Sequence, residues 1–495
     1  MKNKLFIGLI ICYFFNMVFI ANPSRANGFG PNEWTQYRMN FNNNPVFSNE
    51  DSRIINSSFK TGDQIRSTPV VVGDNIFIGN HGSGDIYSYN IITGDLNWEN
   101  KAPNWIHSEI LNVNNKLYVG YGNRFYQKKG ELRGTGKSGL LCLDATTGKV
   151  LWNYSTKGEV MPTPAIYNDS VYIVTGDKHL YEVDLVSGKT KWEFNLGSII
   201  NMSSPVISNG VLFVGGSNKE NLLALDLDKR KIKWETNFEG THGLGDIPPA
   251  LYNNEIVFVT ALKENSKMPP LKDIFDKYGT VRTYKEIVKR ALKPVIDGSV
   301  LQNEEHYLYA LDAKNGEVLW KKNLGNGAWV KNNKSGAPMV YKNNVYLGSP
   351  ITKKYYSVDV KSGEINWDYE VGFLTKAPPV AEKNIVYFTD VGGYVSAFDS
   401  KAGELLGRKQ LGGKLAPSGP IIMNHNLIVG SQNSKVYALP TNDILGSNDK
   451  PKSNSLVFIG YIYIIPFLIL IALVFSLRYL FKKRKKLKKD YKVAS

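Results

Sequence analysis

An eleven-residue segment that recurs along the chain constrains the fold more than any other feature of the sequence. Its clearest copy, residues 310–320, reads Ala-Leu-Asp-Ala-Lys-Asn-Gly-Glu-Val-Leu-Trp. Variants occupy residues 88–98, 142–152, 182–192, 224–234, 357–367 and 397–407. Apolar alternation leads into the third-position Asp or Asn and resumes after the seventh-position Gly, which predicts a strand, a tight turn and a strand. The Asp can accept hydrogen bonds from the turn, and Gly tolerates a positive φ there.

A second recurring unit precedes each copy of the segment. It consists of a proline at a strand start, a short polar turn and a run of β-forming residues, as in Ser67-Thr-Pro-Val70 ahead of Ile76-Phe-Ile-Gly79. Together the two units give about four strands per repeat, with a period near 40 residues and insertions in two repeats. Four-stranded sheets repeated at this spacing are the blades of a β-propeller. The sequence therefore predicts an all-β fold over residues 27–440.

The pattern A-x-D-x-x-T-G-x-x-x-W resembles the tryptophan-docking motif of quinoprotein-type (PQQ-like) eight-bladed β-propellers. The resemblance covers about residues 34–440 and implies that each closing tryptophan packs against the neighbouring blade. The closing residues are Trp98, Trp152, Trp192, Trp234, Trp320 and Trp367. Arg230 stands at a glycine position and Gly407 at a tryptophan position. We expect looser docking at those two blades.

The eighth repeat lacks its last strand. Residues 420–422, 427–430 and 435–439 supply three strands, after which Pro440 ends the pattern. A ring leaves no free sheet edge only if the missing strand comes from elsewhere in the chain. The apolar run at residues 54–59 is the available candidate. We predict that this N-terminal segment completes the eighth blade.

Both ends of the chain carry membrane-directing patterns. Residues 1–26 combine two lysines, an apolar run and Ser24-Arg-Ala26, which predicts a cleaved signal peptide; an uncleaved anchor is the alternative. After a polar linker at 441–455, the uncharged residues 456–477 are long enough to span a bilayer as a transmembrane helix. The basic tail, residues 478–495, predicts a cytoplasmic C-terminus and a propeller outside the cytoplasmic membrane, in the periplasm or at the cell surface.

The distribution of charge argues against a nucleic-acid partner, and the cysteine content argues against an internal disulfide. Of the formal net charge of +16, the tail carries +8 and the signal segment +3, which leaves about +5 over the propeller. This distribution predicts no nucleic-acid partner. Cys12 lies inside the apolar run of the signal segment, so Cys142 is the single cysteine of the mature chain. It is expected to be a small buried apolar residue, and no internal disulfide can form.

Two insertions interrupt repeats after a second strand, at residues 121–138 and 262–304. Connections after second strands and links between blades emerge on the same face of a propeller, so both insertions are expected there. Within the longer one, residues 271–292 have apolar positions at helical spacing, with a break at Gly279. This predicts one or two amphipathic helices that end near Pro294. Their apolar stripe is expected to be the main partner-binding element.

Two segments resemble parts of the active site of quinoprotein dehydrogenases, which hold PQQ and Ca²⁺ near the propeller axis. Residues 241–249 place Asp246 where that family has its catalytic aspartate, and residues 130–134 place Glu131 where it has a calcium-binding glutamate. The resemblance implies that Asp246 is a catalytic base and Glu131 a metal ligand, with Trp105 and Trp329 as cofactor-binding residues. The alternative is that the two carboxylates are solvated loop residues and the two tryptophans pack between blades.

Departures from the dehydrogenase pattern favour a function without catalysis. Gly245 replaces the family's tryptophan beside the aspartate, and the chain has no Cys-x-x-Cys-His haem site. The blade type resembles instead the propeller subunit of the outer-membrane β-barrel assembly machinery. We therefore predict a membrane-anchored scaffold that binds envelope or membrane proteins and uses no cofactor. A PQQ- and calcium-dependent dehydrogenase that oxidises an alcohol or sugar is the alternative hypothesis.

Overall fold

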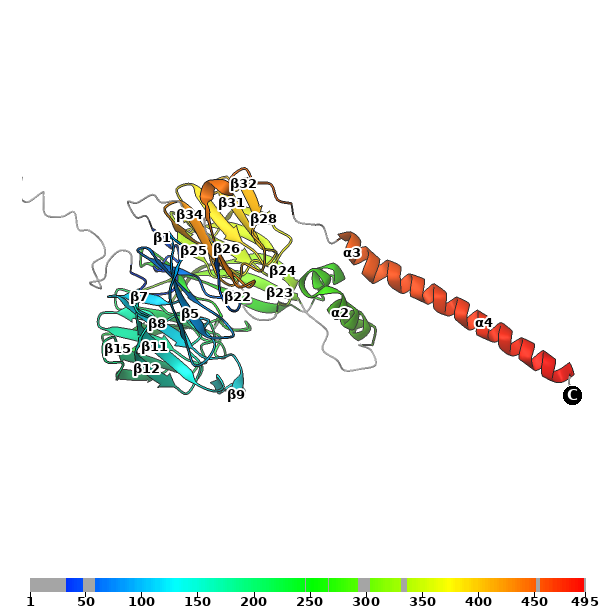
Figure 1. The fold of residues 1–495 in the computed structure, drawn as a ribbon, viewed down its shortest axis with the longest axis horizontal. Helices are drawn as coiled ribbons and strands as arrows, with labels where there is room; N and C mark the ends of the chain where they lie inside the picture. The colour runs from blue at the N-terminus through cyan, green and yellow to red at the C-terminus, as the bar shows by residue number, and fades with distance from the viewer. Residues whose placement is uncertain are drawn as a thin grey trace, which may run out of the picture.

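A ring of eight β-sheets forms the body of the protein, and a long C-terminal helix projects from it (Figure 1). The structure is a computed structural model that describes residues 33–47, 58–244, 246–265, 267–292, 303–330, 336–450 and 455–493. Seven sheets of the ring have four strands and the eighth has five. The expected eight-bladed, all-β propeller is therefore confirmed. The proposed signal peptide, residues 1–26, lies outside the described residues.

Each blade is built from strands that follow one another from the axis outward. The first four blades contain β3 (Val70–Val72), β4 (Asn75–Gly79), β5 (Asp85–Asn90) and β6 (Leu96–Lys101); β7 (Leu111–Val113), β8 (Lys116–Tyr121), β11 (Ser138–Asp144) and β12 (Val150–Thr156); β13 (Ala165–Tyr167), β14 (Ser170–Val174), β15 (His179–Asp184) and β16 (Thr190–Asn195); β17 (Val206–Ser208), β18 (Val211–Gly215), β19 (Asn221–Asp226) and β20 (Lys231–Asn237). The next three contain β21 (Ala250–Tyr252), β22 (Ile256–Asn265), β23 (Asn303–Asp312) and β24 (Val318–Ala328); β25 (Met339–Tyr341), β26 (Asn344–Ser349), β27 (Lys354–Asp359) and β28 (Ile365–Glu370); β29 (Val380–Glu382), β30 (Ile385–Thr389), β31 (Tyr394–Asp399) and β32 (Leu405–Gln410). The eighth contains β1 (Val46–Phe47), β33 (Ile421–Met423), β34 (Asn426–Ser431), β35 (Lys435–Pro440) and β2 (Ser58–Lys60).

The core lies between neighbouring blades. Second strands are buried on both faces, as in β14, because a blade packs on either side of them. Outermost strands such as β16 alternate between partly buried and exposed residues, because one edge meets solvent. Apolar clusters cross the blade boundaries: Tyr118 of β8 and Val171 of β14 belong to one of them. Cys142 is buried in the same cluster as a free thiol, as expected.

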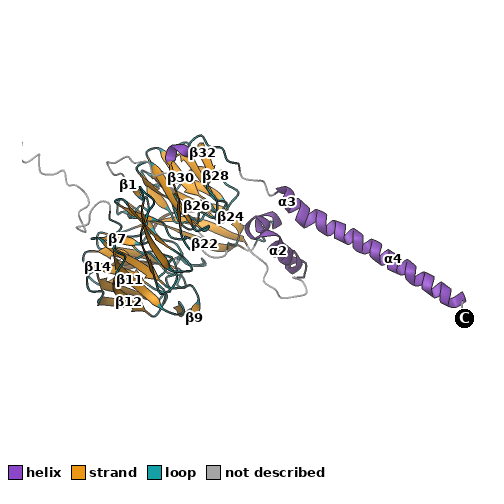
Figure 2. Ribbon diagram, viewed as in Figure 1, coloured by secondary structure: helices purple, strands orange, loops and turns teal. Residues whose placement is uncertain are grey.

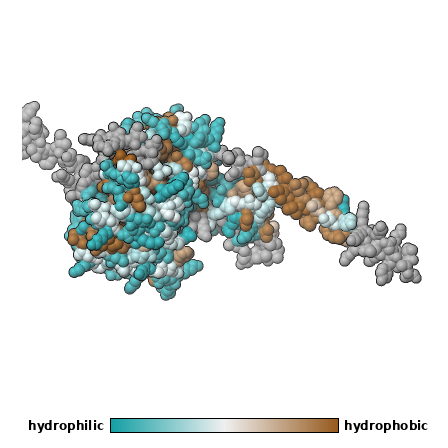
Figure 3. Space-filling view, viewed as in Figure 1, coloured by the Kyte–Doolittle hydropathy of each residue, from teal (hydrophilic) through white to brown (hydrophobic). Residues whose placement is uncertain are grey.

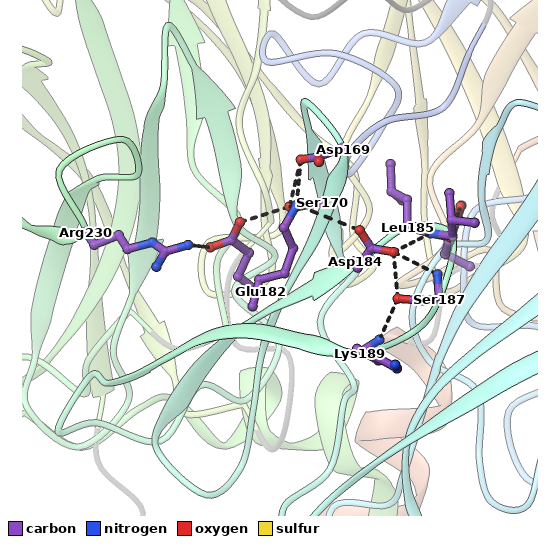
Figure 4. A network of polar contacts seen from close by, with 11 residues as sticks. Asp169, Ser170, Glu182, Asp184, Leu185, Ser187, Lys189 and Arg230 are labelled. Atoms are coloured by element: carbon purple, nitrogen blue, oxygen red, sulfur yellow. Dashed lines mark hydrogen bonds and ion pairs between the residues drawn. The ribbon is translucent and has the colours of Figure 1, made fainter.

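The turn of the recurring segment is held by its third residue. In the copy at residues 182–192, the Asp184 carboxylate accepts hydrogen bonds from the backbone amides of Val186 and Ser187, at 3.1 and 2.8 Å (Figure 4). The bond from the Ser187 amide holds the pKa of Asp184 below its usual value. Gly188 has a φ of 67°, a conformation that a side chain would strain.

Every glycine of the segment except Gly94, which belongs to the first copy, also faces the tryptophan of the preceding copy. A Cβ on Gly148 would lie 2.5 Å from the ring of Trp98, so a larger residue has no room there. The same close approach joins Gly188 to Trp152, Gly316 to Trp234, Gly363 to Trp320 and Gly403 to Trp367. Several rings also donate a hydrogen bond to the next blade, as Trp98 Nε1 does to the carbonyl oxygen of Ala145 at 3.0 Å.

The two positions that depart from the pattern, Arg230 and Gly407, make contacts of their own, and looser docking at these blades stays a prediction. The Arg230 guanidinium lies 5.7 Å from the centre of the Trp192 ring and 3.1 Å from the Glu182 carboxylate (Figure 4). At Gly407 a Cβ would overlap the carbonyl oxygen of Ile444. This overlap arises because the first part of the 441–455 linker packs along β32, where the Arg408 amide donates to the Ser447 carbonyl at 2.8 Å.

Residues 58–60 close the ring. As β2 they pair antiparallel with β35, with Phe59 opposite Val436, and so form the outermost strand of the eighth blade. This confirms the N-terminal closure, although residues 54–57 of the predicted strand lie outside the described residues. A second N-terminal strand, β1, pairs in parallel with the innermost strand β33.

Residues 34–46, which we call the N-terminal belt, run around the axis and bond to all eight blades. Backbone hydrogen bonds join Trp34 to Asn112 of β7, Thr35 to Ile166 of β13, Phe41 to Leu251 of β21, Asn42 to Val340 of β25 and Pro45 to Ile422 of β33. Side chains complete the circuit, from Trp34 to Val71 of β3, from Gln36 to Ile207 of β17 and from Asn44 to Ala381 of β29. No feature of the sequence predicts this belt.

The two insertions lie after second strands, as expected. The shorter one is a hairpin of β9 (Tyr126–Lys128) and β10 (Leu132–Arg133) between β8 and β11. The longer one contains helix α2 (Leu271–Leu292), which is kinked at Gly279, where φ is 74°. In Figure 2, α2 lies between the strands of the ring and the C-terminal helices.

The C-terminal region is helical. It contains a short 3₁₀ helix η1 (Thr441–Asp443), then α3 (Ser455–Ile459), a π-helical turn η2 (Gly460–Ile464) and α4 (Ile465–Val493). Residues Val457–Phe481 are apolar and long enough to cross a membrane, and they form a candidate membrane span. Figure 3 shows this segment as a continuous hydrophobic surface on the C-terminal helix.

Candidate functional site

The axis of the propeller is lined in layers that follow the register of the innermost strands. Because every blade has the same strand order, these strands run in one direction along the axis. The residue four positions before each innermost strand belongs to one layer, which we call the rim layer. Its described members are Arg66, His107, Met161, Met202, Asp246, Lys376 and Pro417, and all of them line one cavity of about 50 Å³.

A wider cavity of about 320 Å³ adjoins the rim layer and shares Arg66, Lys376 and Pro417 with it. Its other lining residues come from inter-blade links, from α2 and from the turns after the second strands β26, β30 and β34. We call the two cavities together the axial mouth. It lies on the face that carries both insertions, because second strands end where innermost strands begin.

The opposite side of the rim layer is sealed by the N-terminal belt. The fully buried Arg38 guanidinium donates to the carbonyl oxygens of Pro420 and Pro379, at 2.8 and 2.7 Å. The Asn43 amide donates to the carbonyl oxygens of Pro338 and Pro249, at 2.9 and 3.1 Å. These prolines directly precede innermost strands, so their carbonyl groups have no strand partner of their own at the axis.

Glu109 connects the seal to the cavity above it. One of its carboxylate oxygens accepts a hydrogen bond from the Arg38 backbone amide at 2.7 Å. Complete burial raises the pKa of Glu109 to about 7, and the positive charge of Arg38 opposes that rise. The carboxyl group therefore titrates near neutral pH.

Cations dominate the wall of the axial mouth. Arg66, Lys376 and Lys414 come from three different inter-blade links, whereas Lys277 comes from α2 and Lys353 from the turn after β26. Burial, followed by repulsion from Arg66, lowers the pKa of Lys376 to about 8, and the negative charge of Asp246 opposes this shift. The positive charges are thus close enough to influence one another.

Arg66 is held in place by a neutral histidine. Its Nη1 lies 3.1 Å from Nε2 of His81, and burial together with the Arg66 charge lowers the pKa of His81 to about 3. In the neutral tautomer that carries its proton on Nδ1, Nε2 accepts a hydrogen bond from the guanidinium. The ring of His81 in turn lies 4.8 Å from the ring of Trp105.

Of the four residues that the dehydrogenase resemblance singled out, only Asp246 lies in the axial mouth. Glu131 is exposed on the β9–β10 hairpin and pairs with Lys128 at 2.6 Å. Trp105 packs between His81 and Phe125, and the Trp329 carbonyl accepts a hydrogen bond from Tyr278 of α2. Within the described residues, no group of three or more His, Cys, Asp and Glu side chains could hold a metal ion.

The residues at the axial mouth therefore do not fit the PQQ and Ca²⁺ set of the alternative hypothesis. Glu131, the calcium ligand in that alternative, lines neither cavity, and the charged side chains that line the mouth with Asp246 are mainly cationic. A divalent cation is disfavoured beside Arg66 and Lys376, since like charges repel. The arrangement instead suits a group of negative charge.

The apolar stripe of α2 is not open to a partner along its whole length. Phe275 packs against Phe458 of α3 with ring centres 5.2 Å apart, and Ile274 packs on Ala328 of β24. The Tyr284 hydroxyl bonds to the carbonyl oxygen of Tyr461. The expectation that this stripe is the main partner-binding element is therefore wrong for these positions, because the chain's own strand β24 covers Ile274 and its C-terminal helices cover Phe275 and Tyr284.

The cations of the axial mouth are the candidate site residues that sequence reasoning missed. Each stands alone in a different repeat, so none forms a local motif. A usable signal was the position four residues before each predicted innermost strand, because that position points to the axis in every blade. Superposed repeats would have placed Arg66, Asp246 and Lys376 in one layer.

Comparison with known proteins adds a family and several relatives. Residues 132–265 and 280–443 match the family described as outer membrane protein assembly factor BamB. The chain is 25% identical over 384 residues to the tetrathionate hydrolase of Acidithiobacillus ferrooxidans, an alignment that covers 73% of this chain and 70% of that protein.

Two solved structures share the fold. One is BamB from Moraxella catarrhalis, with a TM-score of 0.53 and 17% identity, over 78% of this chain and 96% of that one. The other is the quinohemoprotein alcohol dehydrogenase from Comamonas testosteroni, with a TM-score of 0.57 and 14% identity, over 88% of this chain and 83% of that one. At such identities the likeness establishes the fold alone.

Proposed function

Because the chain belongs to the family described as outer membrane protein assembly factor BamB, we propose that it is a membrane-anchored scaffold for protein partners in the cell envelope. The observation that carries this proposal is the contact of α2 with both the propeller and the C-terminal helix. Asp273 of α2 accepts a hydrogen bond from the Ala328 amide of β24 at 2.6 Å, while Phe275 packs on Phe458. We call α2 with these two contacts the brace. A scaffold needs such a connection, because a propeller held in a fixed position presents its binding face in one direction.

The anchor is the apolar helix that follows the brace. Phe467 and Leu470 are 62% and 59% exposed, an unusual degree for large apolar side chains unless lipid covers them. The basic residues 478–495 follow this span and favour a cytoplasmic C-terminus, with the propeller on the other side of the membrane. Protease added to sealed vesicles of known orientation should digest the propeller and spare a tag at the C-terminus, or the reverse in inverted vesicles.

The β9–β10 hairpin is the best-supported partner face. Phe125 and Tyr126 are 51% and 45% exposed, and Phe125 rests on Trp105 with ring centres 5.3 Å apart. Exposed aromatic residues backed by a rigid layer are enriched where proteins bind one another. The hairpin rises from the face of the axial mouth, the same face that carries the brace.

A site-specific cross-linker tests the partner face. A photoreactive amino acid placed at position 125 should give one dominant adduct in intact cells. The matched control is position 186, where Val186 is 72% exposed on a turn of the opposite face. Equal adduct patterns from both positions would remove the support for the hairpin as a partner face.

The position of Asp246 supports a second candidate function, which is an enzyme that acts on a small molecule at the axial mouth. A relative is named tetrathionate hydrolase, and Asp246 is a carboxylate in a cavity with Lys376 and Arg66. Under this function Asp246→Asn should abolish turnover of tetrathionate, and Glu131→Ala should not change it. In the PQQ-dependent alternative, purification with PQQ and Ca²⁺ should give a bound chromophore, an outcome that the position of Glu131 outside both cavities does not favour. Under the scaffold function neither result is expected.

A further inference from the structure

Three cations from different blades meet at the axial mouth. Arg66 precedes β3, Lys376 precedes β29 and Lys414 lies in the link before β33, yet all three line the cavity of about 320 Å³. Bringing like charges together in a partly buried site costs free energy unless negative charge offsets it. The fold nevertheless places them on one wall, where a negatively charged ligand would offset their repulsion.

The other two cations of the cavity are already neutralised by α2. Lys277 lies 3.3 Å from the Asp273 carboxylate and donates to the carbonyl oxygens of Ala328 and Ile351. Lys353 lies 3.1 Å from Asp273 and 3.2 Å from Asp276. The two aspartates of α2 are therefore committed to holding that helix on the propeller.

Asp246 is the carboxylate that remains to offset Arg66, Lys376 and Lys414. Among the described lining residues of both cavities, the other carboxylates are Asp276, which is bonded to Lys353, and Glu109, which is bonded to the belt. Among the described lining residues, the three cations therefore outnumber the one carboxylate that faces them, which gives this wall a net positive charge.

We propose that the axial mouth binds a compact anion with two or more negative charges, held by Arg66, Lys376 and Lys414. A volume of about 320 Å³ is at the lower end of the range of about 300–1,000 Å³ that small-ligand pockets occupy. Phe373, Leu374 and Pro417 form the apolar part of its wall. Such a wall excludes water and strengthens each charge interaction inside the cavity.

The details of two cations agree with an anionic ligand. The Nε of Arg66 is buried without a hydrogen-bond partner, although Nη1 of the same group faces His81. A guanidinium group can bind an oxyanion through two parallel donors, so this Nε supplies a donor of the right kind. The pKa of Lys376, near 8 because of burial and the Arg66 charge, would rise when an anion binds beside it.

This site is independent of whether the protein is a scaffold or an enzyme, because binding needs no turnover. The same charge pattern could receive a soluble oxyanion or the headgroup of an anionic lipid. Because α2 contacts both the mouth and the apolar helix, the mouth lies near the candidate membrane span, so that either a soluble oxyanion or a lipid headgroup could reach it.

Calorimetric titration of the full chain in uncharged detergent tests the proposal. Pyrophosphate and tetrathionate are the probes, and acetate is the singly charged control. We expect the two probes to bind and acetate to bind at least about tenfold more weakly. Lys376→Gln and Lys414→Gln should each weaken the probes about tenfold or more, which is the loss of one charge-assisted hydrogen bond.

Asp246→Asn gives an effect of the opposite sign. It removes the negative charge of the mouth, so the probes should bind more tightly, by about tenfold. A variant that merely damages the fold cannot tighten binding, which separates the two explanations. Lys409→Gln is the matched control, because Lys409 lies on the outermost strand β32 and pairs with Asp443; it should leave binding unchanged.

Nanodiscs of neutral lipid, with and without added anionic lipid, identify the source of the anion. If a lipid headgroup occupies the mouth, anionic lipid should compete with pyrophosphate; if the ligand is soluble, it should not. The proposal is overturned if neither probe binds, if Lys376→Gln and Lys414→Gln bind as tightly as the wild type, or if Asp246→Asn weakens binding.

Discussion

At the sealed end of the axis the Arg38 guanidinium is surrounded by backbone carbonyl oxygens. At the axial mouth, by contrast, the positive charges of Arg66 and Lys376 repel each other. Both ends place cations at the axis: Arg38 belongs to the N-terminal belt, whereas Arg66 and Lys376 lie four residues before innermost strands. At the sealed end the acceptors come from the chain itself, from Pro379 and Pro420. At the mouth, the described lining residues include one carboxylate, that of Asp246, which is not already bonded to α2's partner Lys353 or to the belt, and it faces three cations.

The difference teaches how to separate structural from functional charges in a repeat protein. A buried cation whose donors are all used by the backbone stabilises the fold and has no capacity for a ligand. A cluster with excess charge costs stability and is retained where it binds something. The two ends should therefore respond to substitution in opposite ways, in stability at one end and in binding at the other.

Arg38→Ala should give the largest loss of stability. It leaves the carbonyl oxygens of Pro379 and Pro420 buried without a donor, so the free energy of unfolding should fall by about 3–6 kcal/mol, for two hydrogen bonds to a charged group. Lys414→Ala, at the exposed rim, should change it by less than about 0.5 kcal/mol. Urea unfolding of the full chain in detergent, followed by tryptophan fluorescence, measures both. Equal losses would show that the two ends do not differ in this way.

Asp273→Ala should release the brace without breaking the seal. It removes an acceptor from the Ala328 amide and a partner from Lys277 and Lys353, at a local cost of about 1.5–3 kcal/mol. Hydrogen exchange should rise in α2 and stay unchanged in residues 34–46. Lys272→Ala is the control on the same helix, because its pair with Asp276 lies near the surface and should be worth about 0.5 kcal/mol or less. Faster exchange at the belt would mean that mouth and seal open together.

Glu109→Gln should have the smallest effect, and it depends on pH. Burial raises the pKa of Glu109 from 4.5 to about 7, so its contribution to stability is complete below the lower value and is lost as pH rises through the higher one. Between about pH 6 and pH 8 the wild type should lose about 1.4 kcal/mol more than Glu109→Gln does. Urea unfolding of both proteins at the two pH values measures the difference. The titration of Glu159 and of the histidines contributes equally to both proteins and therefore cancels. Parallel pH profiles would show that the Glu109 carboxyl group is not shifted in the folded state.

The blades could be predicted from the sequence because their defining contacts are local. Asp184 bonds to amides two and three residues further along, and the turn glycine follows at the next position, so one short pattern records the strand–turn–strand unit. The closing strand could also be predicted, because the eighth repeat is one strand short and a ring tolerates no open edge. In both cases the physical requirement is visible in a single stretch of chain.

The belt and the axial mouth could not be predicted in the same way. Residues 34–46 have no apolar period, since their partners are backbone groups of innermost strands spread over the whole ring. Arg66 and Lys376 acquire meaning only when the repeats are superposed in register. The amphipathic pattern of α2 correctly predicts a helix, but an apolar stripe does not specify whether Phe458 or another protein covers it.

The N-terminal belt has a consequence for the order of events on the ribosome. Arg38 and the carbonyl group of Pro420 are 382 positions apart, so one of the first segments to be synthesised waits for one of the last before it can bond. Contacts of such sequence separation form slowly, and the open edges of an unfinished ring are prone to aggregate. Early blades can assemble while translation continues, but the ring can be completed only after the eighth blade has emerged. A nascent chain that stops before residue 420 thus lacks β33, β34 and β35 of the eighth blade, so that β1 and β2 have no strand to pair with, a state that quality-control proteases can recognise and remove.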